Sequence, residues 1–464
     1  MTSSPNIILH IGLGCFHRAH QAAYLHALQE SGDRTWGLVG GNIRGDTAVT
    51  MDALASQHGQ YTLETVSPAG ERVYQRICSI EEVIPFSRGL GRLIHIGAQP
   101  TTRIISFTVT EAGYFLTPAN EVDTTHPDLR NDLENGTLCT IYSAITAILL
   151  ERMRQASGPV TLLSCDNLRS NGARFRSGLL DFVTRRAEAG LCEWIKANTT
   201  CPSSMVDRIT PRPTNDVAGR VFVATGWADR APVMAEQFVQ WVLEDQFIAG
   251  RPNWAKVGAE FVDSVHAHEE AKIRVLNATH SCLAWSGTLR GLSFIHEDVA
   301  VPSIQKIAYD YVTHDVIPSL VTPGHPSPLD LPRYRDIVFN RFSNPFVRDS
   351  NQRVAMDGFS KIPGFVLPTI RECIVANRSC AAVAMLPALF FVFLQRWNRG
   401  ELPHPYEDAV MDPQAIRDIF AAEDPLAAFC RDRVLWCELA GDQALLAAMR
   451  HAHQRVEQFL QTPI

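Results

Sequence analysis

The stretch from Asn6 to His20, NIILHIGLGCFHRAH, constrains the fold of this chain more than any other. An apolar run, Ile7 to Ile11, leads directly into Gly12-x-Gly14, the order of a strand and a glycine-rich turn in a dinucleotide-binding βαβ unit. The third glycine of that fingerprint is missing, and His17 stands in its place. Gly12 and Gly14 still allow a tight turn and a close approach of the backbone to a pyrophosphate, while a purely structural turn is the alternative.

The first half of the chain alternates short β-branched runs with helix-like stretches, which is typical of a parallel sheet covered by helices. From about residue 266 onward, helical periodicity replaces the strand signals. The sequence therefore predicts an α/β fold with a Rossmann-like parallel-sheet domain over residues 1–265, followed by a mostly α-helical domain over residues 266–464. The candidate strands are Ile7 to Ile11, Trp36 to Gly40, Thr102 to Val109 and Val160 to Cys165.

Composition narrows the class of protein. The chain has 464 residues, 46% of them hydrophobic, and a net charge of -7 without a basic block, which argues against nucleic acid as a partner. Eleven cysteines without a C-x-x-C pair fit a reducing cytoplasm better than a disulfide framework. The N-terminus does not resemble a signal peptide. The apolar run Ala381 to Leu394 is short for a bilayer span and predicts a buried helix, so we expect no membrane partner.

The second candidate strand ends in WGLVGGNIRGD. An acidic residue beyond this strand is where NAD enzymes bind the ribose 2'-hydroxyl, and Asp46 is the candidate. Arg44 beside it is suited to a 2'-phosphate instead. The preference for NAD over NADP is therefore a weaker prediction than the dinucleotide site itself.

Polar residues in TLLSCDNLRSNG follow the fourth candidate strand. Asp166 and Asn167 fall at its carboxyl end, where open α/β sheets place their ligands. An Asx-turn that caps the next helix is the simpler interpretation of such a pair.

The segment EEAKIRVLNATHS predicts a helix with functional groups on one face. At 100° per residue, Glu269, His280 and Asn277 lie at about 60°, 80° and 140° from Lys272. Leucines share this arc, which suggests polar groups set in an apolar wall of a cleft. Burial would lower the pKa of Lys272 toward the working pH of a general base, and Asn277 is a neutral donor for a developing alkoxide. An exposed Glu269–Lys272 pair with a packed His280 is the alternative.

A third polar segment, RFSNPFVRDSNQRVAMDGFSK, contains Arg353 and Lys361. Either side chain can donate to substrate hydroxyls, although isolated residues of these types are more often surface charges. The chain has no H-x-x-x-H motif, no C-x-x-C motif and no tight carboxylate cluster, so we do not expect a zinc alcohol dehydrogenase or any other bound metal.

Six blocks in order resemble the polyol-specific long-chain dehydrogenases, the family of mannitol 2-dehydrogenase and the hexuronate reductases. The blocks are HIGLGCFHRAHQAAY, FTVTEAGY, SCDNLRSNG, MVDRITPRP, EEAKIRVLNATHSCLA and RFSNPFVRDSNQRVAMDGFSKIP, and they span most of the chain. Other stretches, such as ETVSPAGER and AMLPALFFVF, are similar to the members that act on D-arabinitol.

The resemblance implies roles for individual residues. Lys272 would be the general base, Asn167 and Asn277 would bind the alcohol or alkoxide oxygen, and His280 would orient the substrate or the base. Asp207 would shape the pocket, Arg353 and Lys361 would hold distal hydroxyls, and Glu269 would gate water and proton access to the lysine. The motif GxGxFHRAH is how this family forms its dinucleotide turn. The residues expected to bind the coenzyme are Ile11, Gly12, Leu13, Gly14, Cys15, Phe16, His17, Arg18, Asp46 and Thr110.

The implied reaction is the NAD-dependent, zinc-independent oxidation of a polyol to a ketose, D-arabinitol to D-xylulose, by a monomer or weak homo-oligomer. D-mannitol to D-fructose is the alternative substrate pair. A hexuronate reductase would need additional cationic residues for a carboxylate. A catalytically silent sugar or dinucleotide sensor on the same scaffold is the alternative from another class, but it would not need Lys272, Asn277 and His280 together.

Overall fold

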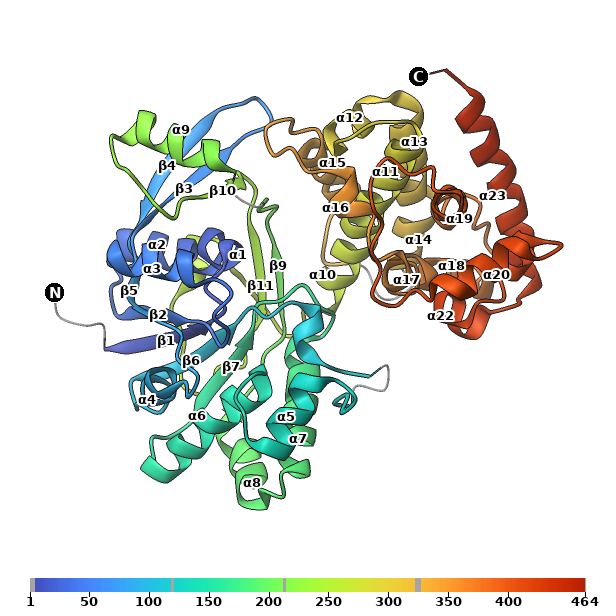
Figure 1. The fold of residues 1–464 in the computed structure, drawn as a ribbon. Coiled ribbons are helices and arrows are strands. Elements are labelled where there is room, and N and C mark those ends of the chain that lie inside the picture. The colour runs from blue at the N-terminus through green and yellow to red at the C-terminus, as the bar shows by residue number, and fades with distance from the viewer. Residues whose placement is uncertain (1–4, 118–120, 212–213, 322–326, 464) are drawn as a thin grey trace. The chain divides into compact units, whose positions relative to one another are not determined.

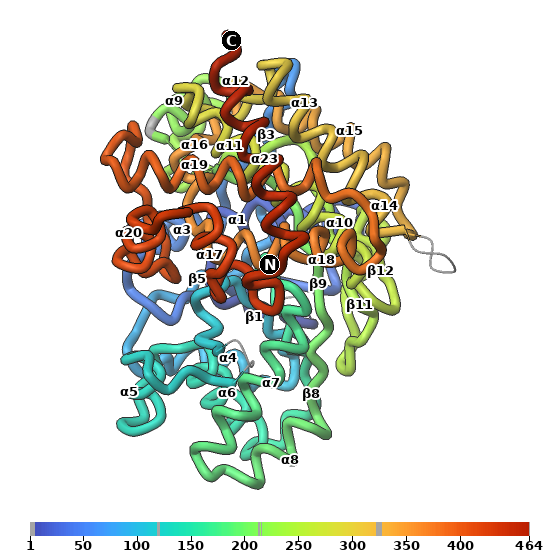
Figure 2. The backbone as a smooth tube through the Cα atoms, turned by 90° about the vertical axis from the view of Figure 1, so that its right-hand side faces the viewer, coloured from blue at the N-terminus to red at the C-terminus, as the bar shows by residue number. Residues whose placement is uncertain are grey.

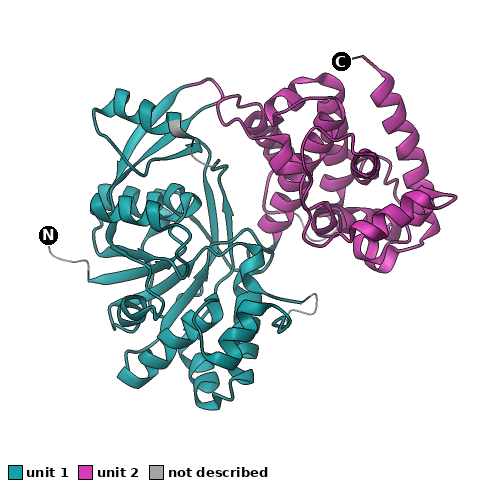
Figure 3. Ribbon diagram, in the orientation of Figure 1, with its two compact units in different colours: residues 1–67, 71–266 teal, residues 68–70, 267–464 magenta. Residues whose placement is uncertain are grey.

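The computed structural model describes residues 5–117, 121–211, 214–321 and 327–463. Contacts between residues divide the chain into two compact units (Figure 3). The first unit contains residues 1–67 and 71–266, and the second contains residues 68–70 and 267–464.

A six-stranded parallel sheet forms the centre of the first unit (Figure 1). Its order is β5-β2-β1-β6-β7-β8, so the chain leaves β1 on one side toward β2 and later returns to its other side at β6. Such a reversal of strand order leaves a ligand-sized crevice at the carboxyl ends of the strands. The strands are β1 (Asn6–Ile11), β2 (Trp36–Gly41), β5 (Ile80–Ile84), β6 (Thr102–Phe107), β7 (Val160–Ser164) and β8 (Thr199–Thr200).

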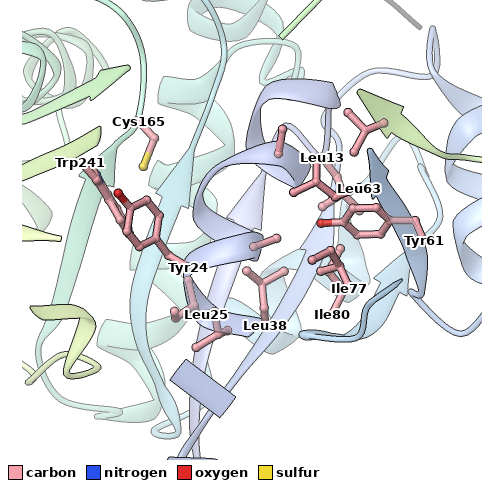
Figure 4. Packing of buried hydrophobic residues seen from close by; sticks show 14 of the residues in the cluster. Leu13, Tyr24, Leu25, Leu38, Tyr61, Leu63, Ile77, Ile80, Cys165 and Trp241 are labelled. Carbon is pink, nitrogen blue, oxygen red and sulfur yellow. The ribbon is translucent and has the colours of Figure 1, made fainter. Parts of the chain in front are cut away.

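Helices cover both faces of this sheet, which is why its strands are continuously apolar rather than alternating. Ile8 packs into one core with Leu25 and Leu38, whereas its neighbour Leu9 packs into a second core with Ile105. Figure 4 shows the first of these cores. The helices of the α/β part are α1 (Cys15–Ala19), α2 (Gln21–Glu30), α3 (Ala48–Ser56), α4 (Gly91–Gly97), α5 (Pro127–Asn135), α6 (Ile141–Gln155), α7 (Asn171–Arg185) and α8 (Ala189–Asn198). The predicted helix-covered parallel sheet is confirmed.

Two smaller three-stranded sheets complete the first unit. One has the order β10-β3-β4 and the other the order β12-β11-β9. Their strands are β3 (Tyr61–Val66), β4 (Arg72–Ile77), β9 (Ser204–Asp207), β10 (Val233–Glu236), β11 (Gln240–Glu244) and β12 (Glu260–Val262). This part of the chain also contains η1 (Glu111–Tyr114), α9 (Asn215–Thr225) and η2 (Trp254–Val257).

The second unit is mostly helical, and its chain path can be followed in Figure 2. Its buried centre includes α19, where every side chain from Met385 to Leu394 is buried, as predicted for this apolar run. The elements are α10 (His266–Ala271), η3 (Lys272–Asn277), α11 (Ala278–Leu289), α12 (Ile295–Ala300), α13 (Pro302–Tyr311), η4 (Val312–Val316), α14 (Ile317–Leu320), α15 (Leu331–Phe342), α16 (Asn351–Ala355), α17 (Gly358–Lys361), η5 (Ile362–Val366), α18 (Leu367–Val375), α19 (Met385–Arg399), α20 (Pro413–Ala421), α21 (Pro425–Phe429), α22 (Arg433–Trp436), η6 (Cys437–Leu439) and α23 (Gln443–Gln461).

Candidate functional site

A cavity of about 590 Å³ lies at the carboxyl ends of β1, β2 and β6 in the first unit. The turn after β1, the loop after β2 and the loop after β6 form its walls together with the segment that leads into α6. Eight of the residues predicted to bind a coenzyme line it, namely Ile11, Gly12, Gly14, Cys15, Phe16, His17, Asp46 and Thr110. Leu13 and Arg18 are described but are not among the lining residues.

The turn after β1 has the shape that the glycine pattern predicts. Gly12 has a φ of +104°, and a Cβ atom there would lie 2.1 Å from the carbonyl oxygen of Thr108. The hydroxyl of Thr108 also contacts this glycine, because it donates a hydrogen bond to the Gly12 carbonyl at 2.7 Å. The Gly14 amide donates to the Gly12 carbonyl, also at 2.7 Å, and closes the turn. Only glycine fits at position 12, because both the backbone conformation and the space exclude a side chain.

The side chains of Leu13 and Arg18 pack inside the first unit and do not line the cavity. The Leu13 side chain is buried in the core of Figure 4. The Arg18 guanidinium donates to the carbonyl of Ala231 and lies 5.2 Å from the ring centroid of Tyr61. These contacts direct the Arg18 side chain into the packing of the unit, and its role in coenzyme binding stays a prediction.

His17 lines the cavity as a neutral ring. It stacks on His10 with 3.4 Å between ring centroids and an angle of 15° between the planes. Burial, and then the charges of His10, His20 and Arg18, lower the pKa of His17 well below its ordinary value. The imidazole can therefore act at the cavity wall as a hydrogen-bonding group, but it supplies no positive charge.

Asn42 is a residue of this site that the sequence analysis missed. It follows β2, lines the cavity and accepts a hydrogen bond from the Leu13 amide at 2.7 Å. Its amide group also donates to the hydroxyl of Thr47, so it connects the turn after β1 to the start of α3. The available signal was an asparagine at the carboxyl end of a strand, two residues before Arg44.

Arg44 and Asp46 both line the cavity, but Arg44 is already paired. Its guanidinium lies 2.7 Å from the carboxylate of Asp128, in the first turn of α5. This ion pair is partly exposed, so it orients the arginine more than it stabilises the fold.

Asp166 is the buried polar residue at the end of β7. Its carboxylate accepts hydrogen bonds from the amides of Val109 and Thr110 and from the hydroxyl of Tyr114. The Asp166 side chain therefore faces the neighbouring loop after β6 instead of capping the helix that follows it. For Asn167 the Asx-turn interpretation stays a prediction. Asn167 comes directly after it and is exposed, whereas Asp207, the last residue of β9, is buried.

In the second unit, Lys272 begins a π-helical segment inside one long helix. Element α10 continues through η3 into α11, and η3 covers Lys272 to Asn277. The predicted 100° per residue is therefore wrong across this segment. A π-helix joins residues i and i+5 by a backbone hydrogen bond, so Asn277 lies about one turn after Lys272, closer to its face than the α-helical spacing predicts. Lys272 and Glu269 are both buried, which excludes an exposed surface pair.

Asp349 joins two predicted site residues of the second unit. One of its carboxylate oxygens lies 3.1 Å from His280 Nε2, and the Arg353 guanidinium donates to both oxygens at 2.6 and 2.7 Å. Burial opposes ionisation of Asp349, but its contacts with His280 and Arg353 outweigh burial and lower its pKa to about 2. Asp349 was missed in the sequence, although an aspartate four residues before an arginine is a recognised ion-pair spacing.

Lys361 and His280 complete this charged cluster. The Lys361 ammonium donates to the carbonyl of Val354 at 2.7 Å, and burial lowers the pKa of Lys361 to about 8. Burial also lowers the pKa of His280, which stacks on Phe342 at 4.7 Å. Element η5, which follows Lys361 directly, packs against η3. The tertiary structure thus brings the lysine-bearing helix together with the segment that carries Lys361.

Neither a metal-binding cluster nor a membrane-spanning helix is found among the described residues. No group of three or more His, Cys, Asp or Glu side chains among them is arranged to hold a metal ion. Within the same residues, none of the helices combines the length and the apolar character needed to cross a bilayer.

Comparisons with known proteins cover nearly the whole chain. Residues 6–256 match the family model of the mannitol dehydrogenase Rossmann domain, and residues 264–457 match that of the mannitol dehydrogenase C-terminal domain. D-arabinitol 4-dehydrogenase of Ralstonia nicotianae is 58% identical over 97% of this chain and 96% of its own length. The enzyme of that name from Klebsiella pneumoniae is 52% identical over 95% and 96%. The structure of Pseudomonas fluorescens mannitol 2-dehydrogenase in a ternary complex with NAD and D-mannitol is similar, with a TM-score of 0.85 and 32% identity over 99% of this chain and 95% of that one.

Proposed function

The chain belongs to the mannitol dehydrogenase family, and we propose on this basis that it is an NAD-dependent polyol dehydrogenase that oxidises D-arabinitol to D-xylulose. The observation that carries the choice of substrate is the 58% and 52% identity to two D-arabinitol 4-dehydrogenases over nearly the full length of each chain. D-mannitol is the second candidate, because a relative of the same fold was solved with it at 32% identity.

The first unit fits a dinucleotide. Its cavity lies where doubly wound sheets bind nucleotides, and Gly12 allows the turn after β1 to pack directly against Thr108 at the cavity wall. Asp46 is suited to the ribose 2'-hydroxyl of NAD. Arg44, which could otherwise attract a 2'-phosphate, is neutralised by Asp128. These contacts support NAD over NADP.

The second unit supplies the proton chemistry. We assign Lys272 as the general base that removes the hydroxyl proton, since it is a buried lysine at the start of η3 and a positioned lysine amine can accept a proton from a reacting group. Asn277, about one π-helical turn away, donates to the developing alkoxide without adding charge. Glu269, buried beside Lys272 in the chain, is assigned to the path of water and protons to that amine. NAD, when bound, accepts the hydride from the substrate carbon.

The remaining polar residues bind the polyol. His280, Arg353 and Lys361 form the cluster around Asp349 and can donate to substrate hydroxyls. In the first unit, Asn167 and Asp207 are assigned to substrate binding. A base on Lys272 requires no metal-bound hydroxide, and we propose that the reaction is independent of zinc.

A substrate panel tests the proposal. The purified protein is mixed with D-arabinitol, D-mannitol, D-sorbitol or xylitol and with NAD or NADP, and the formation of reduced coenzyme is followed by absorbance. We expect the highest kcat/KM with D-arabinitol and NAD. Higher kcat/KM with D-mannitol selects the second candidate, and no reduction of either coenzyme by any polyol refutes the proposed activity.

The role of Lys272 predicts a specific loss. Lys272→Ala should lower kcat by about 10²-fold or more, because general-base catalysis typically contributes that much. NADH affinity should stay close to that of the parent, since the cavity belongs to the other unit. Lys306→Ala is the matched control, because Lys306 is an exposed lysine of the same unit that pairs with Asp310. A near-normal rate for Lys272→Ala contradicts the assignment.

A further inference from the structure

The loop after β6 is held in a conformation that its residue disfavours. Thr110 has φ +66° and ψ 167°, although it is β-branched, and it lines the cavity at the start of η1. A positive φ at a β-branched residue is an outlier that persists only where the surroundings impose it. The structure therefore needs a group that fixes Thr110 at the cavity wall.

Asp166 is that group. Its Oδ1 accepts from the Val109 amide at 2.9 Å and from the Thr110 amide at 2.8 Å. Its Oδ2 accepts from the Tyr114 hydroxyl at 3.1 Å, at the far end of η1. Asp166 is 6% exposed as a residue, and these three donors all come from the loop after β6 and the element that follows it.

The backbone of Asp166 is fixed from the opposite side. Its carbonyl accepts from the Leu168 amide and from the Asn171 side chain, both at 2.9 Å. Asn171 also exchanges two hydrogen bonds with the backbone of Ser204, the first residue of β9. Asn167 is itself exposed, but it lies between Asp166 and Leu168, whose backbones are joined by a hydrogen bond. Its backbone is therefore held in place.

We infer that Asp166 is a positioning residue that holds the coenzyme wall at Thr110 and the substrate residue Asn167 in a fixed relation to each other. This inference rests on the proposed function and deepens it. The side chain of Asp166 would then affect coenzyme affinity by positioning Thr110. Its backbone would affect kcat by positioning the next residue, Asn167.

The burial of this charge supports a functional role. Burial raises the pKa of Asp166 to about 6, against the lowering effect of its hydrogen bonds to Val109, Thr110 and Tyr114. The protein thus places a carboxyl group where burial disfavours its charged form and three hydrogen bonds favour it. An asparagine at this position would fill the same space and would still offer one oxygen to the two amides, without burying a charge. The need to fill this space therefore does not explain why the residue is an aspartate.

The test uses Asp166→Ala and Asp166→Asn in the full chain. NADH affinity is measured by calorimetry, kcat and KM for D-arabinitol by absorbance, and folding by thermal unfolding. Asp166→Ala leaves the two amides and the tyrosine hydroxyl without their acceptor, so we expect about tenfold weaker NADH binding and a lower kcat. Asp166→Asn keeps an acceptor for the amides but replaces the oxygen that accepts from Tyr114 by an NH2 donor. It should recover most of the NADH affinity, while its kcat stays below that of the parent.

Asp229→Asn is the matched control. Asp229 is also buried and also accepts backbone amides, from Thr62 and Ala231, but it does not line the cavity. Parental NADH affinity and kcat in a folded Asp166→Ala variant overturn the inference. If the alanine variant does not fold, Asp166→Asn decides, and it overturns the inference when its NADH affinity, kcat and KM all equal those of the parent. A parent protein that neither binds NADH nor oxidises a polyol refutes the proposed function instead.

Discussion

At the scale of single residues, Gly12 is a position that only glycine can occupy. Its φ of +104° and the 2.1 Å that would separate an added Cβ atom from the Thr108 carbonyl oxygen exclude any side chain. The turn after β1 and the loop after β6 meet at this point, so a change here moves both walls of the cavity.

Gly12→Ala should therefore lower NADH affinity by more than about tenfold and the free energy of unfolding by about 2 kcal/mol, as expected for strain at a positive-φ site. Calorimetric titration with NADH and urea unfolding measure the two effects. Gly190→Ala is the control, because a Cβ atom at Gly190 meets no neighbour within 4 Å and its φ is not positive. Equal NADH affinity for parent and Gly12→Ala would show that the turn does not contact the coenzyme.

Asp349 is the residue that organises the cluster of the second unit. Asp349→Asn removes the charge that holds Arg353 and faces His280, so both side chains lose their fixed orientation. We expect KM for D-arabinitol to rise about tenfold, in line with the loss of a buried charge-assisted hydrogen bond, with NADH affinity unchanged. Asp310→Asn, which breaks the pair with the exposed Lys306, is the control. A rise in KM for NAD instead of D-arabinitol would contradict the assignment.

At the scale of secondary-structure elements, the described part of the second unit has three π-helical segments, each between α-helices. Element η3 packs against both η4 and η5. Three of the residues proposed for catalysis and binding lie at two of these segments: Lys272 begins η3, Asn277 ends it, and Lys361 directly precedes η5. Such departures from α-helical geometry are frequent at functional sites, where they redirect side chains.

Element α12 carries a buried carboxyl group that makes stability depend on pH. Asp298 is fully buried, and its Oδ1 accepts from the Asn351 side chain at 3.0 Å. Burial raises the pKa of Asp298 from 3.8 to about 8. The folded state thus binds this proton more tightly than the unfolded state, so the contribution is full below pH 3.8, falls as pH rises and is lost above about pH 8.

Asp298→Asn should remove this dependence. The free energy of unfolding of the parent minus that of the variant should fall by about 1.4 kcal/mol per pH unit between about pH 5 and about pH 7. Urea unfolding at several pH values measures it. Asp336→Asn, at an exposed carboxylate of the same unit, should show no such trend. A constant difference between parent and Asp298→Asn would mean that Asp298 is ionised throughout this range.

At the scale of the whole molecule, the chemistry that we propose is divided between the two units. The first unit contains the cavity proposed for the dinucleotide and, outside its lining, Asn167 and Asp207. The second contains Lys272, Asn277 and the cluster around Asp349. The proton acceptor that we propose is a protein side chain, so we expect that the reaction does not depend on a dissociable metal.

Dialysis of the whole protein against EDTA should therefore leave kcat for D-arabinitol unchanged, as measured by absorbance before and after treatment. A zinc alcohol dehydrogenase treated in parallel is the positive control for metal removal. Loss of activity that added Zn²⁺ restores would refute the zinc-independent mechanism.

The class of fold and the place of the dinucleotide turn could be predicted from the order of the amino acids alone. Strand periodicity, the glycine pattern after β1 and the helical periodicity of the second half depend on neighbouring residues, and local backbone preferences act at that range. The residues at positions 12 and 14 were identified for this reason, as was the helix that carries Lys272.

Which polar groups meet, by contrast, depended on the packing of distant elements. Asn42 reaches Leu13, Asp166 reaches Val109 and Asp349 reaches His280, and each pair is separated by many residues that carry no signal of the contact. The Arg18 side chain lies in the packing because its hydrogen-bond partner, the Ala231 carbonyl, comes from a distant segment. The change from an α-helical to a π-helical register at Lys272 is not encoded in the apolar periodicity either. Hydrogen bonds between distant segments depend on how the elements pack, and a periodic pattern encodes which face is buried but not what lies opposite it.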